Sequence, residues 1–215
     1  MGFQSHFFQT SDVAEGREYI LRNTGTEEFE LDQGACFSGL RHQNAVIGCS
    51  SMNAVQWNCF DSFVVRKVEK PSNYSFHFVT QGQCVVGQGK HSFTANAGDV
   101  YVLHPGQQSR EHWFGDCQQL ILRIKADEIT AAAAKILGRK LNDNLQFNTL
   151  AADPGIAAWL NAMPQLRPDF ALDQTTLFDD RRVAYHLEQS LIMMLLSGLA
   201  HSSTFDMSHS NATPV

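Results

Sequence analysis

A succession of short apolar runs separated by glycine turns constrains this chain more than any other feature. Residues 74–86 form an extended run, a turn at Gly82 and a returning run, and a second turn at residues 98–99 leads into the apolar run 100–103. That run stops at the Pro-Gly pair 105–106. Glycine permits tight reversals, and proline lacks the N–H that a neighbouring strand needs. This order predicts antiparallel strands that form half of a small barrel.

Brief β-rich runs continue on both sides of this stretch. Broken by Gly, Asn and Pro, they cover residues 45–52, 62–68, 74–80, 83–86, 91–95, 100–103 and 120–124. Short strands with turn signals at this spacing are typical of an antiparallel barrel or sandwich. The 15 glycines and 15 phenylalanines in 215 residues favour the same turn-rich, largely β body.

Helical signals lie on both sides of the β-rich region. Ser11 or Asp12 can cap a short helix that reaches about Arg22, with Glu15 placed to complete a capping box. After residue 126 an alanine-rich helix stops at Gly138, a usual residue at helix C-termini.

Two further helices are expected beyond the alanine-rich one. An Asp-Pro pair opens the first at residues 153–154, and Pro164 ends or kinks it. The second starts near residues 179–180 and runs towards His201, and its latter half is apolar nearly all round. Such a helix must be covered on more than one side.

Charge and hydropathy argue against DNA binding by this segment and against a membrane-spanning helix. The net charge is −6 and no basic cluster exceeds the pairs at 139–140 and 181–182, so the segment lacks the basic footprint that duplex DNA requires. The longest apolar run, Leu191 to Ala200, is well short of the roughly 20 residues that cross a membrane. We expect no membrane contact.

The cysteines and the N-terminus indicate the compartment. Five cysteines, at positions 36, 49, 59, 84 and 117, show no CxxC spacing, and an odd number argues against a disulfide framework. The first residues carry no basic apolar leader and no myristoylation signal. A reducing cytoplasm fits both observations.

The stretch from residue 74 to 106 resembles the sugar- and metabolite-binding domain of AraC/XylS transcription regulators. In that family a strand ending in Gly-Gln, here residues 82–83, is followed by Ala-Gly-Asp, here 97–99, an apolar strand and a Pro-Gly turn. Residues 122–124, the alanine-rich helix and residues 145–147 resemble the family's passage from barrel to helices, especially in its XylS-like branch. Residues 187–191 onwards resemble its last helix, which helps to pair subunits.

The resemblance covers nearly the whole chain and implies an α+β fold. It consists of a cupin-like antiparallel β-barrel of the jelly-roll type followed by a C-terminal helical dimerisation region. Residues 1–125 are expected to form the barrel with an N-terminal arm and a short helix, residues 126–201 the helical region, and residues 202–215 a flexible tail or linker. The implied partners are a small-molecule effector, an aromatic acid if the XylS-like likeness holds, and a second copy of the chain.

The chain departs from the family at its C-terminal end. AraC-type regulators continue into two helix-turn-helix units, whereas only a polar tail follows Leu199. We therefore expect DNA contact only through a missing C-terminal helix-turn-helix domain, while this segment senses a metabolite and dimerises. No cofactor and no catalytic residue is expected.

A stand-alone metal-dependent cupin enzyme, an oxygenase or isomerase, is the alternative function. Such barrels hold a metal through two histidines on one strand, a nearby glutamate and a later histidine. Here His77 has no second histidine on its strand, and Gln81 and Gln83 occupy the region where glutamate is wanted. His104 and His112 flank the Pro-Gly turn and could join His77. Because the second histidine and the glutamate of the usual ligand set are missing, we expect no metal site.

Polar and aromatic residues of the predicted strands are candidates for contacts with the effector, because ligand pockets combine apolar walls with a few placed polar groups. Arg66 follows two valines in a predicted strand, and if it points inward it can clamp a carboxylate through two parallel hydrogen bonds. The alternative for each candidate is an ordinary surface or core position. The candidates are Arg41, His42, Trp57, Arg66, Phe76, His77, Arg110 and Gln119.

The last helix offers a dimerisation seam. Its apolar surface exceeds what one intramolecular contact usually needs, so we expect it both to sit on its own sheet and to pair subunits. On this view substituting Leu195 by Glu yields soluble monomers. The seam residues are Leu187, Leu191, Met194 and Leu195.

Overall fold

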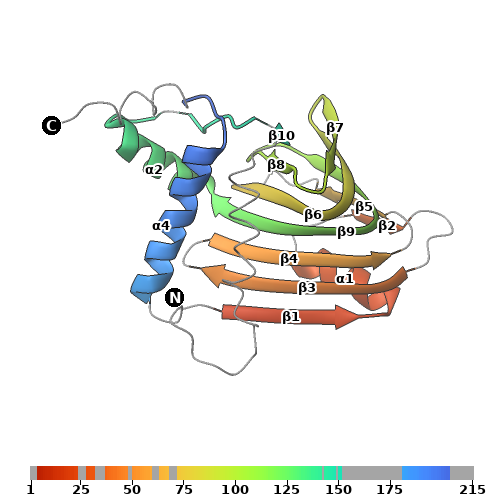
Figure 1. Cartoon of the computed structure of the whole chain (residues 1–215). Coiled ribbons are helices and arrows are strands. Elements are labelled where there is room, and N and C mark those ends of the chain that lie inside the picture. Colours follow the sequence, from red (N-terminus) through yellow and green to blue (C-terminus); the bar gives the residue numbers. More distant parts are fainter. Residues whose placement is uncertain are drawn as a thin grey trace.

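A computed structural model describes most of the chain (Figure 1). The described residues are 4–23, 28–31, 37–47, 50–59, 63–67, 72–141, 143–148, 150–151 and 181–203. The helix predicted to open at residues 153–154 lies outside them, as do the cysteines at 36 and 49.

All described strands belong to one antiparallel sheet. Its main path runs in the order β1-β3-β4-β9-β6-β8-β10, while β5 pairs with β9 and β2, and β7 pairs with β6. The strands are β1 (Gln4–Thr10), β2 (Glu28–Leu31), β3 (Phe37–Ile47), β4 (Ser50–Cys59), β5 (Phe63–Lys67), β6 (Asn73–Gln88), β7 (His91–Asn96), β8 (Val100–Leu103), β9 (Ser109–Lys125) and β10 (Leu150–Ala151). The helices are α1 (Val13–Asn23), α2 (Ala126–Leu137) and α4 (Arg181–Gly198).

The two longest strands, β6 and β9, fold the sheet over on itself. The C-terminal part of β9 pairs with β4, and its N-terminal part pairs with β5, while β6 follows β9 along both parts. The register of β6 against β9 shifts between Val79 and Gln83, where Gly82 has a φ of 70°. In the described residues the pairing does not return from β10 to β1. The sheet is therefore an open jelly-roll sandwich, one of the two antiparallel forms that the strand spacing predicted.

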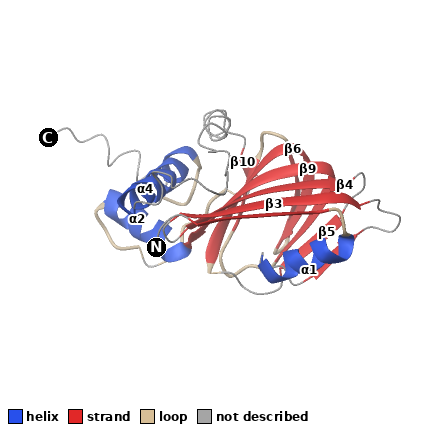
Figure 2. Ribbon diagram, turned by 90° about the horizontal axis from the view of Figure 1, so that it is seen from below, coloured by secondary structure: helices blue, strands red, loops and turns tan. Residues whose placement is uncertain are grey.

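Alternate residues of β6, β8 and β9 supply two separate apolar cores. We call the first the helix-side core, because α2 and α4 cover it (Figure 2). From the sheet it contains Tyr74, Phe76, Phe78, Val100, Val102, Leu122 and Ile124. We call the second the inner core, which lies between the folded halves of the sheet and is joined by Ile20 of α1. Its sheet residues include Leu40, Val79, Cys84, Val86, Tyr101, Leu103, Trp113, Cys117 and Ile121.

The strand predictions hold best around β6 and β8. The run predicted at 45–52 is wrong as a single strand, because β3 ends at Ile47, β4 begins at Ser50 and these two residues pair with each other. The predicted runs 74–80 and 83–86 form one continuous strand, and the run 120–124 is only the end of β9.

The predicted N-terminal helix and its cap are confirmed. Asp12 Oδ1 accepts hydrogen bonds from the N–H groups of Ala14 and Glu15 at 2.8 and 2.9 Å. The capping box is wrong, because the Asp12 N–H donates to the Thr10 hydroxyl and the Glu15 carboxylate accepts from that same hydroxyl.

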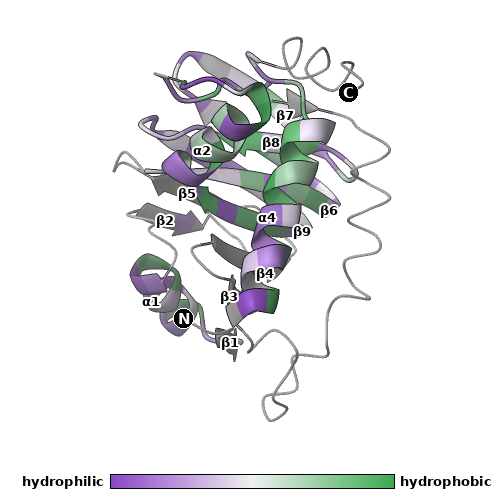
Figure 3. Cartoon of the chain, turned by 90° about the vertical axis from the view of Figure 1, so that its left-hand side faces the viewer, coloured by the Kyte–Doolittle hydropathy of each residue, from purple (hydrophilic) through white to green (hydrophobic). Residues whose placement is uncertain are grey.

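The C-terminal helices pack side by side against one end of the sheet. The alanine-rich helix is α2, and Gly138 caps it with a φ of 63°, as predicted. α4 has its apolar residues towards its C-terminal end, which Figure 3 shows in green above a polar N-terminal turn. The region beyond residue 125 is not purely helical, because β10 adds a strand beside β8.

Candidate ligand-binding site

Four polar side chains converge in the inner core. His77 of β6 is 0% exposed, Tyr101 of β8 is 0%, and Glu111 and Gln119 of β9 are 1% and 2%. Strand register brings them together, because His77 pairs with Tyr101 across β6 and β8, and their rings stack with centroids 4.4 Å apart.

The four side chains share one hydrogen-bond network. Gln119 Oε1 lies 2.8 Å from His77 Nδ1 and 2.8 Å from the Tyr101 hydroxyl. That hydroxyl also lies 2.8 Å from Glu111 Oε2, and His77 Nδ1 is 3.6 Å from the same carboxylate oxygen. Trp113 Nε1 donates to Glu111 Oε2 at 3.3 Å. The shared bonds compensate the removal of these groups from water.

The Tyr101 hydroxyl has only one proton for its two oxygen neighbours. One arrangement gives Glu111 a proton that it donates to Tyr101, which then donates to Gln119. In the other the Gln119 amide is reversed, so that its NH₂ group donates to Tyr101 and to a deprotonated His77 Nδ1. Burial raises the pKa of Tyr101 well above its usual value, and the charges of Cys84 and Glu111 raise it further. Tyr101 therefore remains a phenol and a hydrogen-bond donor.

Helix α1 covers the inner core from the side of β3. His42, buried on β3, lies with Nδ1 2.7 Å from the Tyr19 hydroxyl of α1. Tyr19 in turn stacks on Phe8 of β1 with ring centroids 3.7 Å apart. Burial raises the pKa of Tyr19, which keeps its proton on the hydroxyl. His42 thus connects the helix to the sheet.

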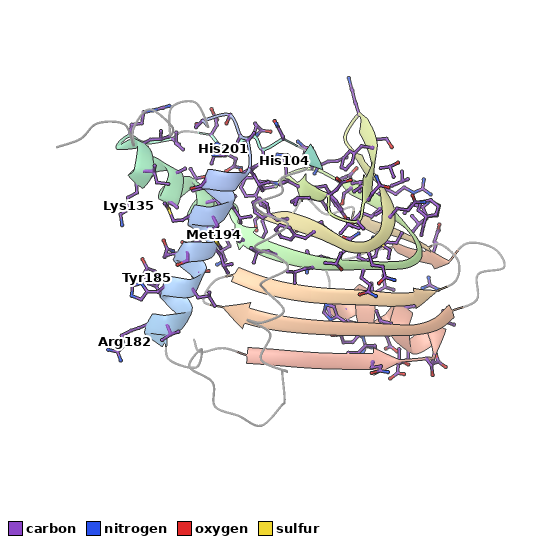
Figure 4. The ribbon with its side chains drawn as sticks, in the orientation of Figure 1. His104, Lys135, Arg182, Tyr185, Met194 and His201 are labelled. Atoms are coloured by element: carbon purple, nitrogen blue, oxygen red, sulfur yellow. The ribbon has the colours of Figure 1, made fainter. Side chains whose placement is uncertain are left out.

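A segment beyond α2, residues 144–148, connects the sheet to the end of α4, and we call it the strap. On the sheet side the Tyr74 hydroxyl donates to Leu145 O at 2.6 Å, and the Phe147 N–H donates to His104 Nε2 at 3.1 Å. On the helix side the Asn148 N–H donates to Ala200 O at 2.9 Å. Figure 4 shows His104 and His201 near one another above the sheet.

The structure brings together three of the residues predicted to bind the effector. His42, His77 and Gln119 are buried at or beside the inner core. Phe76 belongs instead to the helix-side core, where its ring meets Phe147 at 5.2 Å, so it is not part of this site.

Four predicted residues lie elsewhere or outside the described side chains. Arg110 is exposed, because it alternates with the buried Glu111 on β9. Arg41, Trp57 and Arg66 lie on β3, β4 and β5, and their side chains are outside the described part of the structure.

Sequence reasoning missed Tyr101, Glu111 and Arg123. Glu111 and Arg123 occupy the same face of β9 as Gln119, and Tyr101 reaches them from β8. The available signal was the alternation of residues 117, 119, 121 and 123 once β9 is extended as far as Lys125.

The inner network does not have the composition of a metal centre. Among the described residues there is no group of three or more His, Cys, Asp or Glu side chains that could hold a metal ion. His104 contacts Gln88 and the strap, and His112 packs on Phe114 with ring centroids 4.2 Å apart. Neither histidine joins His77.

The residues predicted to form the dimer seam lie mainly inside the chain. Leu191 and Leu195 are buried in the helix-side core, and Leu187 and Met194 are partly buried against it. The large apolar side chains that α4 exposes are Tyr185 at 54% and Met193 at 43%. A glutamate at Leu195 would therefore enter a protein core, so we expect that change to destabilise the fold and not only to separate subunits.

The sequence matches the family described as the AraC-binding-like domain over residues 22–196. The fold resembles that of the AraC-like transcriptional activator CuxR, with a TM-score of 0.62, 12% identity, and coverage of 96% of this chain and 77% of that chain. The predicted α+β, cupin-like antiparallel fold is thereby confirmed. A search of curated proteins finds no match.

Two cupin domains give weaker structural matches. The Schizosaccharomyces pombe Cnp3 cupin domain has a TM-score of 0.36 at 13% identity, covering 49% of this chain and 75% of that chain. A cupin superfamily protein from Desulfitobacterium hafniense has a TM-score of 0.34 at 11% identity, covering 46% and 79%. Separately, no helix in the described part of the chain has the length and apolar character needed to span a bilayer.

Proposed function

We propose, from the premise that this chain belongs to the AraC-binding-like domain family, that it binds a small-molecule effector on the inner face of the sandwich and thereby regulates transcription. The observation that carries the proposal is the polar network of His77, Tyr101, Glu111 and Gln119 within an apolar core. Ligand pockets have this composition, with apolar walls and a few convergent polar groups. DNA contact is assigned to a helix-turn-helix domain outside residues 1–215.

Through the strap, a structural change caused by effector binding can reach the end of α4. Tyr101 of the network and His104 of the strap contact lie at the two ends of one short strand and its following turn. A displacement of β8 on ligand binding would act on His104, and through the strap on residues 200–202 at the end of α4. Effector binding changes regulation only if it favours one position of this element over another.

The proposed homodimer uses the exposed face of α4 rather than the seam residues that the sequence suggested. Tyr185 and Met193 are the described large apolar side chains exposed on that helix. The cytoplasm is the proposed location, because the buried Cys84 and Cys117 are not disulfide-bonded.

Calorimetry on the full chain tests the sensing function. We expect one class among benzoate-like acids, sugars and amines to bind, and Gln119→Leu to weaken that binding at least tenfold, because it removes the amide group that His77 and Tyr101 share. Lys135→Gln, at an exposed position of α2, is the control and should bind as the wild type does. Absence of heat from every class at millimolar concentration contradicts the proposal. A near-stoichiometric metal content after purification would instead favour the metal-dependent cupin enzyme.

A further inference from the structure

Arg123 is a cation on the inner face of β9, close to the end of the strand. Its neighbours Leu122 and Ile124 are both buried in the helix-side core, so Arg123 faces the opposite side, as Gln119 and Ile121 do. Its backbone pairs with Ser75 of β6 on one side and with Ser51 of β4 on the other. The Arg123 side chain therefore starts from the same face of the sheet as the His77 network, and it is half-buried there.

In the described part of the structure no carboxylate lies within ion-pair distance of this guanidinium, and Glu111 acts on it only from farther away. Within the described residues, no hydrogen bond and no ion pair of Arg123 is found. Burial lowers the pKa of Arg123, and the negative charge of Glu111 raises it only in part. An arginine side chain stays protonated in proteins, and a partly buried cation without a partner destabilises the fold. Such a residue is better explained by a charge that arrives with a ligand.

The surroundings of Arg123 are suited to a monoanion. Ser75, which pairs with Arg123 across β6 and β9, is buried, and its small side chain can donate one hydrogen bond. Glu111 lies on the same face of β9 and opposes a second negative charge. A carboxylate accepts two parallel hydrogen bonds from a guanidinium, and its single charge needs only that one cation.

We infer that Arg123 is the anion-binding residue of the effector site and that the effector is a small carboxylic acid whose apolar part lies against the inner core. The inference rests on the proposed function, which it makes more specific. It proposes, in place of the three arginines that the sequence suggested (Arg41, Arg66 and Arg110), one that the register puts on the inner face of the sheet.

The test uses acids and their uncharged amides as matched probes. Titration calorimetry on the full chain compares benzoate with benzamide and hexanoate with hexanamide. We expect at least one acid to bind and its amide to bind at least tenfold more weakly. Arg123→Met should abolish binding of the acid, Arg123→Lys should retain part of it, and Arg110→Met, on the exposed face of the same strand, should not change it.

Thermal unfolding without ligand separates a binding role from a structural one. Because Arg123 makes no hydrogen bond or ion pair in the described part of the chain, Arg123→Met should leave the Tm unchanged or raise it, whereas removal of a structural arginine would lower it. Added acid should raise the Tm of the wild type and not that of Arg123→Met.

Three results overturn the inference. They are unchanged acid binding in Arg123→Met, loss of binding in Arg66→Met but not in Arg123→Met, and binding of neutral probes only. If the amides, or the sugars and amines of the first calorimetry experiment, bind and no acid does, the inference about Arg123 fails but the proposed sensing function stands. If no compound of any class binds, both the inference and the proposed function fail.

Discussion

Gly82 of β6 and Cys117 of β9 touch at the point where the sheet folds over. A Cβ on Gly82 would lie 2.8 Å from the Cys117 Cα and 3.0 Å from its backbone nitrogen. These are backbone atoms, which cannot move aside without moving β9. The contact keeps the two halves of the sandwich close enough for residues on either side of the corner, such as Glu111 and Gln119, to reach one hydroxyl.

Gly82→Ala should destabilise the protein by at least about 2 kcal/mol. The left-handed φ of 70° costs an alanine about 1 to 2 kcal/mol, and the clash with Cys117 adds the cost of overpacking. Gly138→Ala is the matched control, because Gly138 has a φ of 63° but no atom within 4 Å of an added Cβ. The free energies of unfolding in urea are measured for both variants, and their difference gives the cost of the clash with Cys117. Equal losses in the two variants would show that the corner does not depend on close approach.

Tyr74→Phe should loosen the strap. It removes the hydroxyl that donates to Leu145 O at 2.6 Å and leaves that carbonyl buried without its donor, at a cost of about 1 to 2 kcal/mol. The local effect should be faster amide hydrogen exchange at Phe147. Tyr185→Phe, at an exposed position, should change stability by less than about 0.5 kcal/mol. Unaltered exchange at Phe147 would mean that the bond of its N–H to His104 does not depend on the Tyr74 hydroxyl.

The sequence predicted strands best where apolar residues lie close together along the chain. β6 and β8 carry buried residues on both faces, so their runs stand out as strands. The first part of β9 was missed because Ser109, Glu111 and Gln119 are polar yet buried. Their burial depends on partners from β6 and β8, which no local pattern contains. Glu111 and Arg123 could be identified as site residues only after register had placed them on one face.

The two faces of α4 should respond differently to substitution. Leu195→Ala should cost about 2 to 5 kcal/mol, because Leu195 is buried in the helix-side core. Met193→Glu should leave the unfolding free energy of the monomer within about 0.5 kcal/mol, since Met193 is exposed. If α4 pairs two subunits, light scattering should show dimers for the wild type and monomers for Met193→Glu. A wild type that is already monomeric at working concentration would exclude this dimer.

Stability should fall as the pH drops below about 6.5, through His104 and His201. Burial lowers the pKa of both imidazoles, although a backbone hydrogen bond to each partly opposes it. Below the ordinary histidine pKa the unfolded chain therefore binds more protons than the folded one, and the free energy of unfolding decreases until the lowered pKa values are passed. Above pH 7 these two residues should not change the free energy of unfolding any further as the pH rises.

Histidine variants separate this effect from the titration of carboxylates. His104→Gln and His201→Gln should each flatten the dependence of the unfolding free energy on pH between 7 and 5. His186→Gln, at an exposed position on α4, should keep the wild-type slope. Protonation of His104 Nε2 exchanges the bond it accepts from the Phe147 N–H for one that it donates to the Phe147 carbonyl oxygen, so amide exchange at Phe147 should accelerate over the same pH range beyond the intrinsic change. If His104→Gln retains the full slope, His104 is not the strap's pH-sensitive contact.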